Sequence, residues 1–494
     1  MNTNTMFPPM PKSDGNIIIV GGGASGMAAA ITAKQKGAKH VIILEASQTF
    51  GGNAIYAPIP RLQPEEDKAI AAHEDYMRKM DDSNWAADAR LVRTICDQIV
   101  ELPEWLSAFS GDATEGERGG KLARVLADEC DRLGVELHLG CLAKRIIQDE
   151  DGWTTGIEYE ENGMTQTMNA MVVIVASGGF LGDIEMMKRY IPFIDDSFNA
   201  DAALVGKKYS AYGVQMALDC GAGDMGTVSL EWNETRMPFW GKQLSQPIEY
   251  IVTSPSVLWV NNVGVRYCNE GNINSESSVI RQPNKDSFIV VDEGILEELA
   301  RRNPNFSLSQ FKLEVEELID ADQALVCDGA GPLAAWIRGK KHILQSQIDR
   351  YNECCEAGRD FLFGKSPEDL IPFKKPPFYA FRSGIPVVMT HGPIKVNPMM
   401  SCVKLTDFPV RGVLACGGVL GGLYTDQFIS TERCDSLRVA LASGYIAGGH
   451  AANFIGGGKP APLYEFPKFS AREVMAGNYY NVGTPTPPQT AIQA

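Results

Sequence analysis

A short glycine-rich segment is the part of this chain whose residue types and spacing point most directly to chemistry. Gly21, Gly23 and Gly26 form the pattern G-x-G-x-x-G, and Glu45 follows nineteen positions after Gly26. The first glycine allows a tight turn, the second lets a diphosphate approach the backbone, and the third lets a helix pack against a strand. The N-terminus of that helix offers N–H groups to the diphosphate, and Glu45 can accept hydrogen bonds from a ribose. The segment therefore predicts a dinucleotide site, provided that it lies between a strand and a helix.

A second glycine pair, Gly51-Gly52-Asn53, comes shortly after Glu45. A nicotinamide dehydrogenase has no use for such a pair, whereas a flavin has a longer body that lies across the sheet. The two glycine segments together therefore favour FAD over NAD.

Strands and helices must present these glycines. Residues 16–20 form a continuous apolar run typical of a buried parallel strand, and the Ala-rich stretch 27–36 ends at Gly37 as a helix does. A second apolar run at 41–44 completes a βαβ unit. Further helices are expected at 65–110 and 121–133, strands at 135–139, 143–161 and 171–176, an irregular, proline-punctuated region at 228–388, and a strand, glycine loop and small-residue helix at 411–455.

The composition narrows the class of protein. The chain carries 45 Lys+Arg and 61 Asp+Glu, 45 − 61 = −16, which argues against a surface for nucleic acid or an anionic membrane. There is no apolar run of about eighteen residues and no secretory signal, so we expect a cytoplasmic protein without a membrane span. The eleven cysteines show no C-x-x-C spacing and no neighbouring histidine, so no metal or iron–sulfur site is expected.

Six ordered segments of the chain resemble one flavoprotein family, that of fumarate reductase, succinate dehydrogenase and 3-ketosteroid Δ1-dehydrogenase. The first segment reads GGGASGMAAAITAKQKGAKHVIILEASQTFGGN, and the second, VVIVASGGFLGDIEMMKRY, is similar to the family strand that ends in Ala-Thr-Gly-Gly. The others are YGVQMALDCGAG, VNNVGVRYCNE, GVLACGGVLGG and SLRVALASGYIAGGHAA.

The resemblance implies an α/β fold. A Rossmann-like discontinuous FAD-binding domain would take residues 14–227 and 389–456, with an inserted α+β capping domain at 228–388 that closes over the flavin. Residues 1–13 would form a flexible leader and residues 457–494 a loose tail.

The resemblance also implies which residues bind FAD. Family members with covalent flavin use a His shortly before the second glycine pair, but residues 46–50 read ASQTF here, so non-covalent FAD is expected. The expected FAD-binding residues are Gly21, Gly23, Ala24, Ser25, Gly26, Glu45, Ala46, Gly51, Gly52, Asn53, Ala143, Ala176, Ser177, Gly178, Gly417, Gly418, Ser436 and Leu437.

The residues with which the family binds dicarboxylates are missing. Met389 stands where the substrate-binding His is expected, Thr431 stands in place of an Arg, and no proton-donating Arg closely follows Glu270. Residues 229–233 also lack the histidine of the cap. Because two carboxylates that enter a pocket without arginine partners meet a large desolvation cost, a small dicarboxylate is disfavoured as the substrate.

Three other residues are candidates for the missing chemistry. Tyr424 could donate a proton or stabilise an enolate, Arg433 could clamp a carbonyl or carboxylate, and His391 could act as an acid or hydrogen-bond donor. Each also has a structural alternative: a core tyrosine, an arginine in a surface ion pair, and a satisfied loop histidine.

The sequence therefore predicts an FAD-dependent oxidoreductase that moves a hydride between flavin N5 and a substrate carbon, at a C–C single or double bond next to a carbonyl or similar group. The direction, enone reductase or ketone dehydrogenase, stays open, and the small-molecule substrate is expected to be neutral or monoanionic. No second G-x-G-x-x-G unit occupies the middle third, so we expect a separate electron donor or acceptor. Two alternatives are a flavin-binding sensor or assembly subunit, and an FAD-dependent amine or hydroxy-acid oxidase or dehydrogenase.

Overall fold

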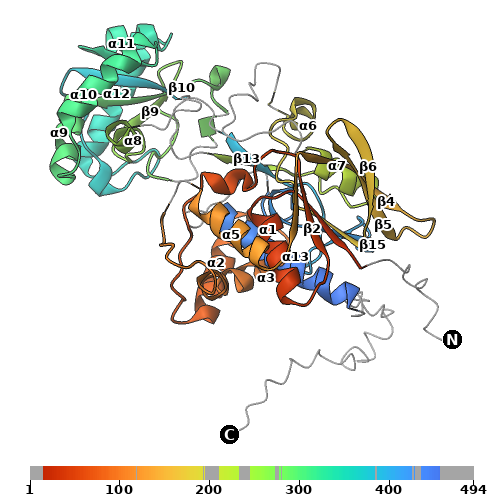
Figure 1. Cartoon of the computed structure of the whole chain (residues 1–494). Coiled ribbons are helices and arrows are strands. Elements are labelled where there is room, and N and C mark those ends of the chain that lie inside the picture. The colour runs from red at the N-terminus through yellow and green to blue at the C-terminus, as the bar shows by residue number, and fades with distance from the viewer. Residues whose placement is uncertain are drawn as a thin grey trace, which may run out of the picture. The chain divides into compact units, whose positions relative to one another are not determined.

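The chain is described from a computed structural model (Figure 1). The structure describes residues 15–117, 120–192, 194, 211–232, 245–272, 278–279, 281–383, 387–425, 428 and 435–456. These residues belong to one compact unit, Met1–Gly457. The predicted leader 1–13, the predicted tail 457–494 and the candidate residue Arg433 lie outside the described residues.

A six-stranded sheet forms the centre of the part that carries the glycine motif. Its strands are β1 Ile17–Val20, β2 Val41–Glu45, β3 Glu136–Leu139, β7 Val172–Val175, β14 Ser401–Val403 and β15 Pro409–Ala415. They lie in the order β14-β15-β7-β1-β2-β3, parallel from β15 to β3, with β14 antiparallel at one edge. Every residue of β1 and β7 is buried, which explains their continuous apolar sequences, IIIV and VVIV. The predicted strands at 16–20, 41–44 and 171–176 are confirmed to within one residue.

Two helices from opposite ends of the chain pack against each other. These are α1 Ala24–Gln35 and α13 Asp435–Ile455, and Gly444 and Gly448 of α13 face the α1 backbone. The predicted start of the first helix at Met27 is wrong by three residues, because the last residues of the glycine motif already form its first turn.

The predicted helical stretch 65–110 contains three helices, α2 Lys68–Asp82, α3 Ala89–Ile99 and α4 Leu102–Ser107. Asp67 and Asp88 cap the first two, because their carboxylates accept hydrogen bonds from backbone N–H groups of the first turn. The remaining elements of this part are α5 Lys121–Arg132, β4 Cys141–Gln148, β5 Thr154–Glu161, β6 Met164–Asn169, α6 Ile184–Tyr190, α7 Ala211–Asp219 and the 3₁₀ helices η2 Gly52–Ile55 and η7 Gly417–Val419.

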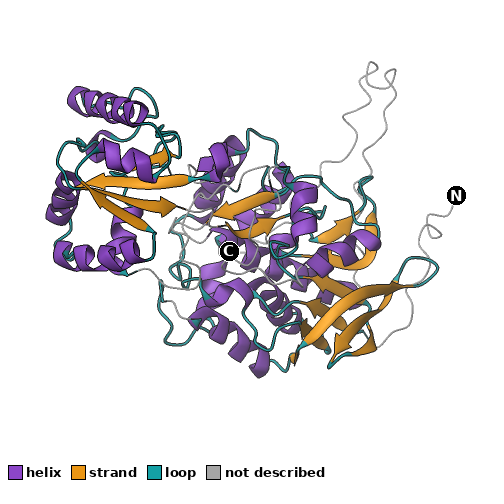
Figure 2. Cartoon of the chain, turned by 90° about the horizontal axis from the view of Figure 1, so that it is seen from above, coloured by secondary structure: helices purple, strands orange, loops and turns teal. Residues whose placement is uncertain are grey.

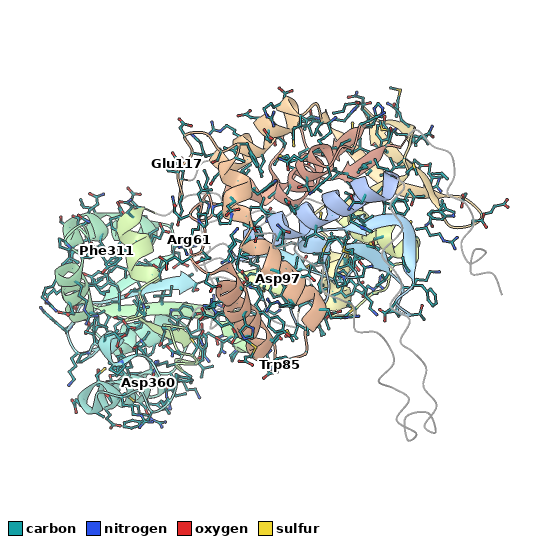
Figure 3. The ribbon with its side chains drawn as sticks, turned by 90° about the horizontal axis from the view of Figure 1, so that it is seen from below. Arg61, Trp85, Asp97, Glu117, Phe311 and Asp360 are labelled. Carbon is teal, nitrogen blue, oxygen red and sulfur yellow. The ribbon has the colours of Figure 1, made fainter. Side chains whose placement is uncertain are left out.

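The stretch from residue 245 to residue 383 has an antiparallel sheet of its own. Its strands lie in the order β11 (Ala324–Cys327), β12 (Phe378–Ser383), β10 (Ser287–Asp292), β9 (Leu258–Asn261). Its polar, proline-punctuated sequence has an irregular texture, but helices and strands occupy it, as the α+β domain implied by the family resemblance requires (Figure 2). The helices are amphipathic and bury one face only. In α10 (Leu308–Asp320), Phe311, labelled in Figure 3, is buried. The adjacent Lys312 is exposed. The elements are α8 Gln246–Val252, β9 Leu258–Asn261, η5 Pro283–Lys285, β10 Ser287–Asp292, α9 Glu293–Arg302, α10 Leu308–Asp320, β11 Ala324–Cys327, α11 Ala330–Trp336, α12 Lys341–Ala357, η6 Pro367–Asp369 and β12 Phe378–Ser383.

Buried apolar residues fall into two separate clusters. The first draws on residues 17–230 and 394–452, whereas the second draws only on residues 248–381. The chain passes between the two clusters at β8 Ser229–Trp232, whose Leu230 belongs to the first cluster, and at β13 Val387–His391. These two strands pair antiparallel. The chain therefore leaves the first cluster through β8 and returns to it through β13.

Candidate active site

The glycine turn between β1 and α1 leaves one of its glycines beside open space. Gly21 has a φ of 109°, and a Cβ there would lie 2.5 Å from the carbonyl oxygen of Ala176. A Cβ at Gly26 would lie 1.9 Å from the carbonyl oxygen of Gly21. Both glycines are therefore required by the packing of strand, turn and helix. A Cβ at Gly23 would meet nothing within 4 Å, which leaves room for a ligand.

The N-terminus of α1 has the features of an anion site. Its N-cap residue, Gly23, offers no side chain, and the helical bonding starts with Met27, whose N–H donates to the Gly23 carbonyl at 2.9 Å. The N–H groups of Ala24, Ser25 and Gly26 precede that bond and have no partner within the helix. No acidic residue stands in the first turn. The arrangement fits the diphosphate of a dinucleotide.

Glu45, at the end of β2, lies directly beside this turn. Its Oε2 accepts a hydrogen bond from the Gly22 N–H at 2.8 Å, and its Oε1 accepts one from the Ser47 N–H at 2.7 Å. Each carboxylate oxygen retains a further lone pair, and the side chain is half-buried. Glu45, followed by Ala46, is therefore placed where a ribose hydroxyl could donate to it.

The second glycine pair lies against the first. Gly51 forms a parallel bridge with Gly23, and a Cβ on Gly52 would lie 3.3 Å from the Gly23 Cα. Both glycines of the pair have positive φ, 108° and 49°. The side-chain amide of Asn53 lies 3.7 Å from the sulfur of Met389, so this pair also reaches β13.

Two further segments at the carboxyl ends of the parallel strands carry predicted cofactor residues. Ala176, Ser177 and Gly178 follow β7; Gly178 has a φ of 77°, and a Cβ there would meet nothing within 4 Å. Gly417 and Gly418 follow β15 in η7. Ala143 is buried in β4, and Ser436 and Leu437 lie in the first turn of α13.

Strand β13 contacts both the glycine segments described above, which we call the cofactor seat, and a group of aromatic side chains. Met389 and His391 point to the same face of β13, because alternate residues of a strand do so. A Cβ at Gly418 would lie 3.2 Å from the Met389 sulfur, which places this face of β13 beside the seat. The ring of His391 stacks on Phe428 at 4.8 Å and meets Tyr424 edge-on at 5.1 Å. We refer to His391, Tyr424 and Phe428 as the aromatic cluster.

Glu231 of β8 forms a hydrogen bond with the His391 ring. The Nε2 atom of His391 lies 2.9 Å from Oε2 of Glu231, and the histidine is only 5% exposed. The other carboxylate oxygen of Glu231 accepts a hydrogen bond from the Ser436 hydroxyl at 2.7 Å. The sequence prediction for residues 229–233 concerns only a missing histidine, so it misses Glu231.

The hydroxyl of Tyr424 is buried and has no hydrogen-bond partner among the described residues. Burial, together with the nearby carboxylates of Asp435 and Glu231, raises the pKa of Tyr424 well above its usual value. The phenol therefore stays neutral and keeps a proton to donate in a hydrogen bond.

A buried group of charges holds the first turn of α13. The Lys79 ammonium lies 2.6 Å from Oδ2 of Asp435 and 3.5 Å from Oδ1 of Asp75, and Arg438 lies 3.7 Å from the other oxygen of Asp75. Burial alone would lower the pKa of Lys79, but the two carboxylates outweigh it and raise that pKa. These two cations are thus engaged with carboxylates of the protein. No sequence motif predicts this group.

The expectation of no metal site overlooks the spacing His138-x-x-Cys141. In the structure, the ligand atoms of His138, Cys141 and Glu161 all lie within 4.8 Å of one another. Burial raises the pKa of the Cys141 thiol to about 11, which opposes the thiolate that a metal needs. The group offers three ligands, one fewer than a closed structural zinc site uses, and we assign no metal to it.

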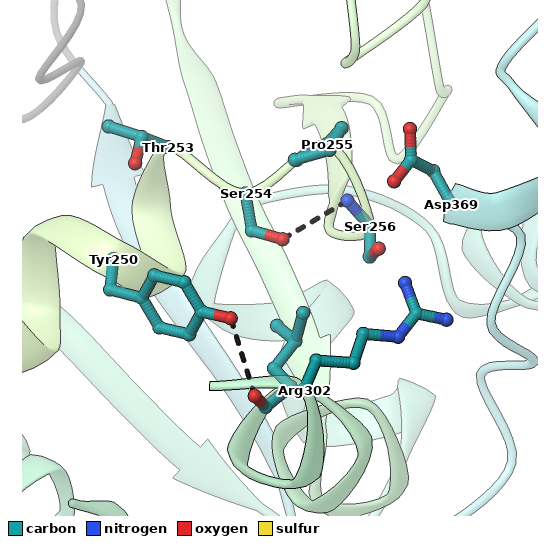
Figure 4. Close-up of a pocket in the computed structure, with 8 residues that line it drawn as sticks. Tyr250, Thr253, Ser254, Pro255, Ser256, Arg302 and Asp369 are labelled. Carbon is teal, nitrogen blue, oxygen red and sulfur yellow. Dashed lines mark hydrogen bonds between the residues drawn. The ribbon is translucent and has the colours of Figure 1, made fainter. Parts of the chain in front are cut away.

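The stretch 245–383 carries a surface hollow (Figure 4). None of the FAD-binding or catalytic residues expected from the sequence lines it. The Tyr250 hydroxyl on its wall donates to the Leu299 carbonyl at 3.3 Å. It is lined by Tyr250, Thr253, Ser254, Pro255, Ser256, Leu299, Arg302 and Asp369.

The parallel sheet, the glycine turn and the uncapped helix N-terminus together define a dinucleotide-binding α/β protein. The chain belongs to the family described as FAD binding domain, whose model matches residues 111–426, and the model for FAD dependent oxidoreductases matches residues 16–186. The chain is thus an FAD-dependent oxidoreductase, and the predictions of flavoprotein family, fold class and cofactor are confirmed.

Proteins with similar sequences include reductases of a vinyl phenol, of acrylate and of fumarate. A vinyl phenol reductase of Lactiplantibacillus plantarum is 26% identical, over 89% of this chain and 96% of its own length. The acrylate reductase flavoprotein subunit of Shewanella woodyi is 25% identical, over 83% of this chain and 86% of its own. An NADH:fumarate oxidoreductase of Klebsiella pneumoniae is 24% identical over 90% of this chain, which spans only 48% of that protein.

Solved structures of the same fold include a 3-ketosteroid-Δ4-(5α)-dehydrogenase of Rhodococcus jostii, with a TM-score of 0.69, 19% identity and coverage of 89% of this chain and 98% of that one. A flavocytochrome c3 fumarate reductase gives a TM-score of 0.65 at 20% identity, with coverage of 89% and 78%. Among the helices that the structure describes, none combines the length and the hydropathy needed to cross a membrane.

Proposed function

We propose that this chain reduces an activated carbon–carbon double bond in a neutral or monoanionic, partly apolar substrate. The observation that carries the proposal is the aromatic cluster of His391, Tyr424 and Phe428, which lies next to Met389 where a dicarboxylate site would need basic residues. Similarity to reductases of a vinyl phenol and of acrylate supports reduction as the direction.

The charges near the cluster oppose a substrate with two carboxylates. Lys79 and Arg438 are engaged with Asp435 and Asp75, and Glu231 adds another carboxylate. A dianion would therefore find Lys79 and Arg438 already engaged, and would enter at a large desolvation cost. A neutral alkene with an aromatic or carbonyl group avoids this cost.

Two residues of the aromatic cluster are assigned different roles in the reaction: Tyr424 binds the substrate and His391 supplies a proton. When bound and reduced, FAD supplies a hydride to one alkene carbon. The raised pKa of Tyr424 makes it a poor acid near neutral pH but a permanent hydrogen-bond donor, so we assign its hydroxyl to the electron-withdrawing group of the substrate. His391 then holds the proton for the second carbon, and Arg433 stays a candidate clamp outside the described residues.

The residues predicted to bind FAD remain our proposal for its site. Gly23 and Gly178 border open space, the N-terminus of α1 suits the diphosphate, and Glu45 suits a ribose. No histidine stands at residues 46–50, which supports non-covalent binding.

We propose an FAD-binding domain, residues 14–227 and 389–456, and a capping domain, residues 228–388. Two separate buried clusters support this division, although Val228 and Leu230 belong to the first cluster. We further propose a separate electron donor, since the similar proteins include an NADH:fumarate oxidoreductase and a cytochrome-type fumarate reductase. A cytoplasmic location stays a prediction.

The test is an anaerobic reoxidation assay. Protein with one bound FAD is reduced chemically and mixed with a vinyl phenol, an enone, a cinnamate or fumarate, and the return of oxidised flavin absorbance is followed. We expect one of the neutral or monoanionic alkenes to react at least ~10-fold faster than fumarate. Fastest reaction with fumarate would contradict the substrate class. No reaction with any alkene would favour the sensor or assembly alternative.

A further inference from the structure

Glu231 connects two parts of the proposed site. It lies in β8, where Met389 of β13 is its partner in register. One carboxylate oxygen lies 2.9 Å from Nε2 of His391, and the other accepts a hydrogen bond from the Ser436 hydroxyl at 2.7 Å. A single carboxylate thus holds the candidate acid and the first turn of α13 together.

The surroundings of His391 leave only one of its ring nitrogens for a substrate. Its Nε2 is engaged by Glu231, and among the described residues Nδ1 has no partner. Phe428 lies nearly parallel to the imidazole, at 16°, and Tyr424 stands at 65° to it, so both rings limit its rotation. A carboxylate on one nitrogen and two rings against its faces fix the orientation of the imidazole, and therefore the direction of the other nitrogen.

We propose that Glu231 is the positioning residue for proton transfer: it fixes the His391 ring and stabilises its protonated form, so that Nδ1 delivers a proton to the substrate. This inference rests on the proposed function. In the step, the Nδ1–H bond breaks and a C–H bond forms at the alkene carbon that does not receive the hydride. The electron pair of the alkene π bond makes the new bond. Neutral His391 keeps its Nε2–H on Glu231 and regains a proton from water.

Few other charged or titratable groups face His391. From β8 there is Glu231, and from the segment after η7 there is Tyr424, which stays neutral. From α2 and α13 the nearby groups are Lys79, Asp75, Asp435 and Arg438, which are engaged with one another. Among the described groups, Glu231 is the one bonded to the imidazole, so variants of Glu231 test the contact directly.

Three variants of the FAD-loaded protein test this role. Glu231→Gln keeps the shape and removes the charge, and Glu231→Asp keeps the charge but shortens the side chain. Glu158→Gln is the control, because Glu158 is a carboxylate of β5 that pairs with Arg145. Two quantities are measured against pH: the reoxidation rate with the alkene, and the His391 titration by NMR, which is tractable with 6 histidines in the chain.

We expect Glu231→Gln to retain FAD and to slow reoxidation by roughly 100-fold. It should move the alkaline limb of the rate profile to lower pH, together with the His391 titration seen by NMR. Glu231→Asp should recover part of the rate and keep the pH limb near its wild-type position. Glu158→Gln should match the wild type in both measurements.

Several outcomes would overturn the proposal. A Glu231→Gln rate within about twofold of the wild type, or an unchanged His391 titration, would do so. If Glu231→Gln does not fold, Glu231→Asp decides, since a wild-type rate in that variant contradicts a positioning role. If the wild-type protein reacts with no alkene, the proposed function fails, but the His391 titration still tests the effect of Glu231 separately.

Discussion

Gly444 of α13 lies directly on the backbone of Ser25 in α1. A Cβ at Gly444 would come within 2.2 Å of the Ser25 carbonyl oxygen. Ser25 belongs to the first turn of α1, which is our proposed diphosphate site. The lack of a side chain at Gly444 therefore allows α13 to pack against the first turn of α1, where we place the diphosphate.

Replacing Gly444 by Ala should lower the free energy of unfolding by about 1–3 kcal/mol, because backbone atoms cannot move aside as a flexible side chain can. Gly449→Ala on the same helix is the matched control. A Cβ at Gly449 meets its nearest atom, Thr32 Cγ2, at 3.7 Å, so alanine should be neutral or stabilising there. Denaturant unfolding of both variants measures the difference, and equal stabilities would refute the packing argument.

Two glycines of the motif should respond differently to alanine. Gly23 has φ −78° and open space around its Cβ position, so Gly23→Ala should leave the apoprotein folded but weaken FAD binding. Gly26→Ala places a Cβ 1.9 Å from the Gly21 carbonyl oxygen, so it should destabilise the apoprotein itself. Thermal unfolding without FAD, followed by FAD titration, separates the two effects. Unchanged FAD affinity in Gly23→Ala would show that Gly23 does not border the cofactor.

Removal of Lys79 should be costly because Asp435 then stays buried without its partner. We expect Lys79→Met to lose about 3–5 kcal/mol of unfolding free energy near neutral pH. The matched control on the same helix is Lys68→Met, whose partners Glu101 and Glu104 are exposed, and we expect little change there.

The deficit of Lys79→Met should also depend on pH. Burial raises the pKa of the Asp435 carboxyl, and loss of the ammonium raises it further. A carboxyl whose folded pKa exceeds its unfolded pKa stabilises the fold at low pH and loses that contribution as the pH rises. The variant should therefore be less impaired at about pH 5 than at about pH 8. A deficit that grows on acidification would contradict this assignment.

Tyr424→Phe should separate stability from activity. The hydroxyl is buried without a described partner, so its removal should leave the free energy of unfolding unchanged or slightly higher. Reoxidation by the substrate should slow by roughly 10²-fold if the hydroxyl polarises the substrate. Tyr445→Phe, whose ring packs edge-on against Trp105, is the control and should alter neither. A wild-type reoxidation rate in Tyr424→Phe would show that the hydroxyl does not act on the substrate and that Tyr424 only packs in the core.

The parts of the fold that the sequence predicts well are those with a local signal. Residues 17–20 and 172–175 are continuous apolar runs because both faces of those strands are covered. The start of α1 was harder to place, because Gly26 belongs to both the turn and the helix. Between 245 and 383 the family resemblance predicts helices and strands, but the residues alone do not place them, since half-exposed amphipathic helices are mostly polar in composition.

The candidate site shows the same division. The glycine segments can be found because the glycines of the motif stand at a fixed spacing, between a strand and a helix that follow each other in the chain. Glu231 and Lys79 could not be found in this way, because their partners are distant: His391 lies 160 residues from Glu231, and Asp435 lies 356 residues from Lys79. The sequence around a single charged residue does not indicate which distant residue it contacts in the fold.

The split of the first buried cluster between residues 17–230 and 394–452 has a consequence for synthesis of the chain. When the ribosome has made β1, β2 and β7, the edge of β7 still lacks β15, and α1 still lacks the helix that covers it. The stretch that follows, with its own buried cluster at 248–381, can fold before β15 has been synthesised. Completion of the cofactor seat is therefore among the last events of biogenesis, and a nascent chain stopped before β15 should neither retain FAD nor protect its central strands.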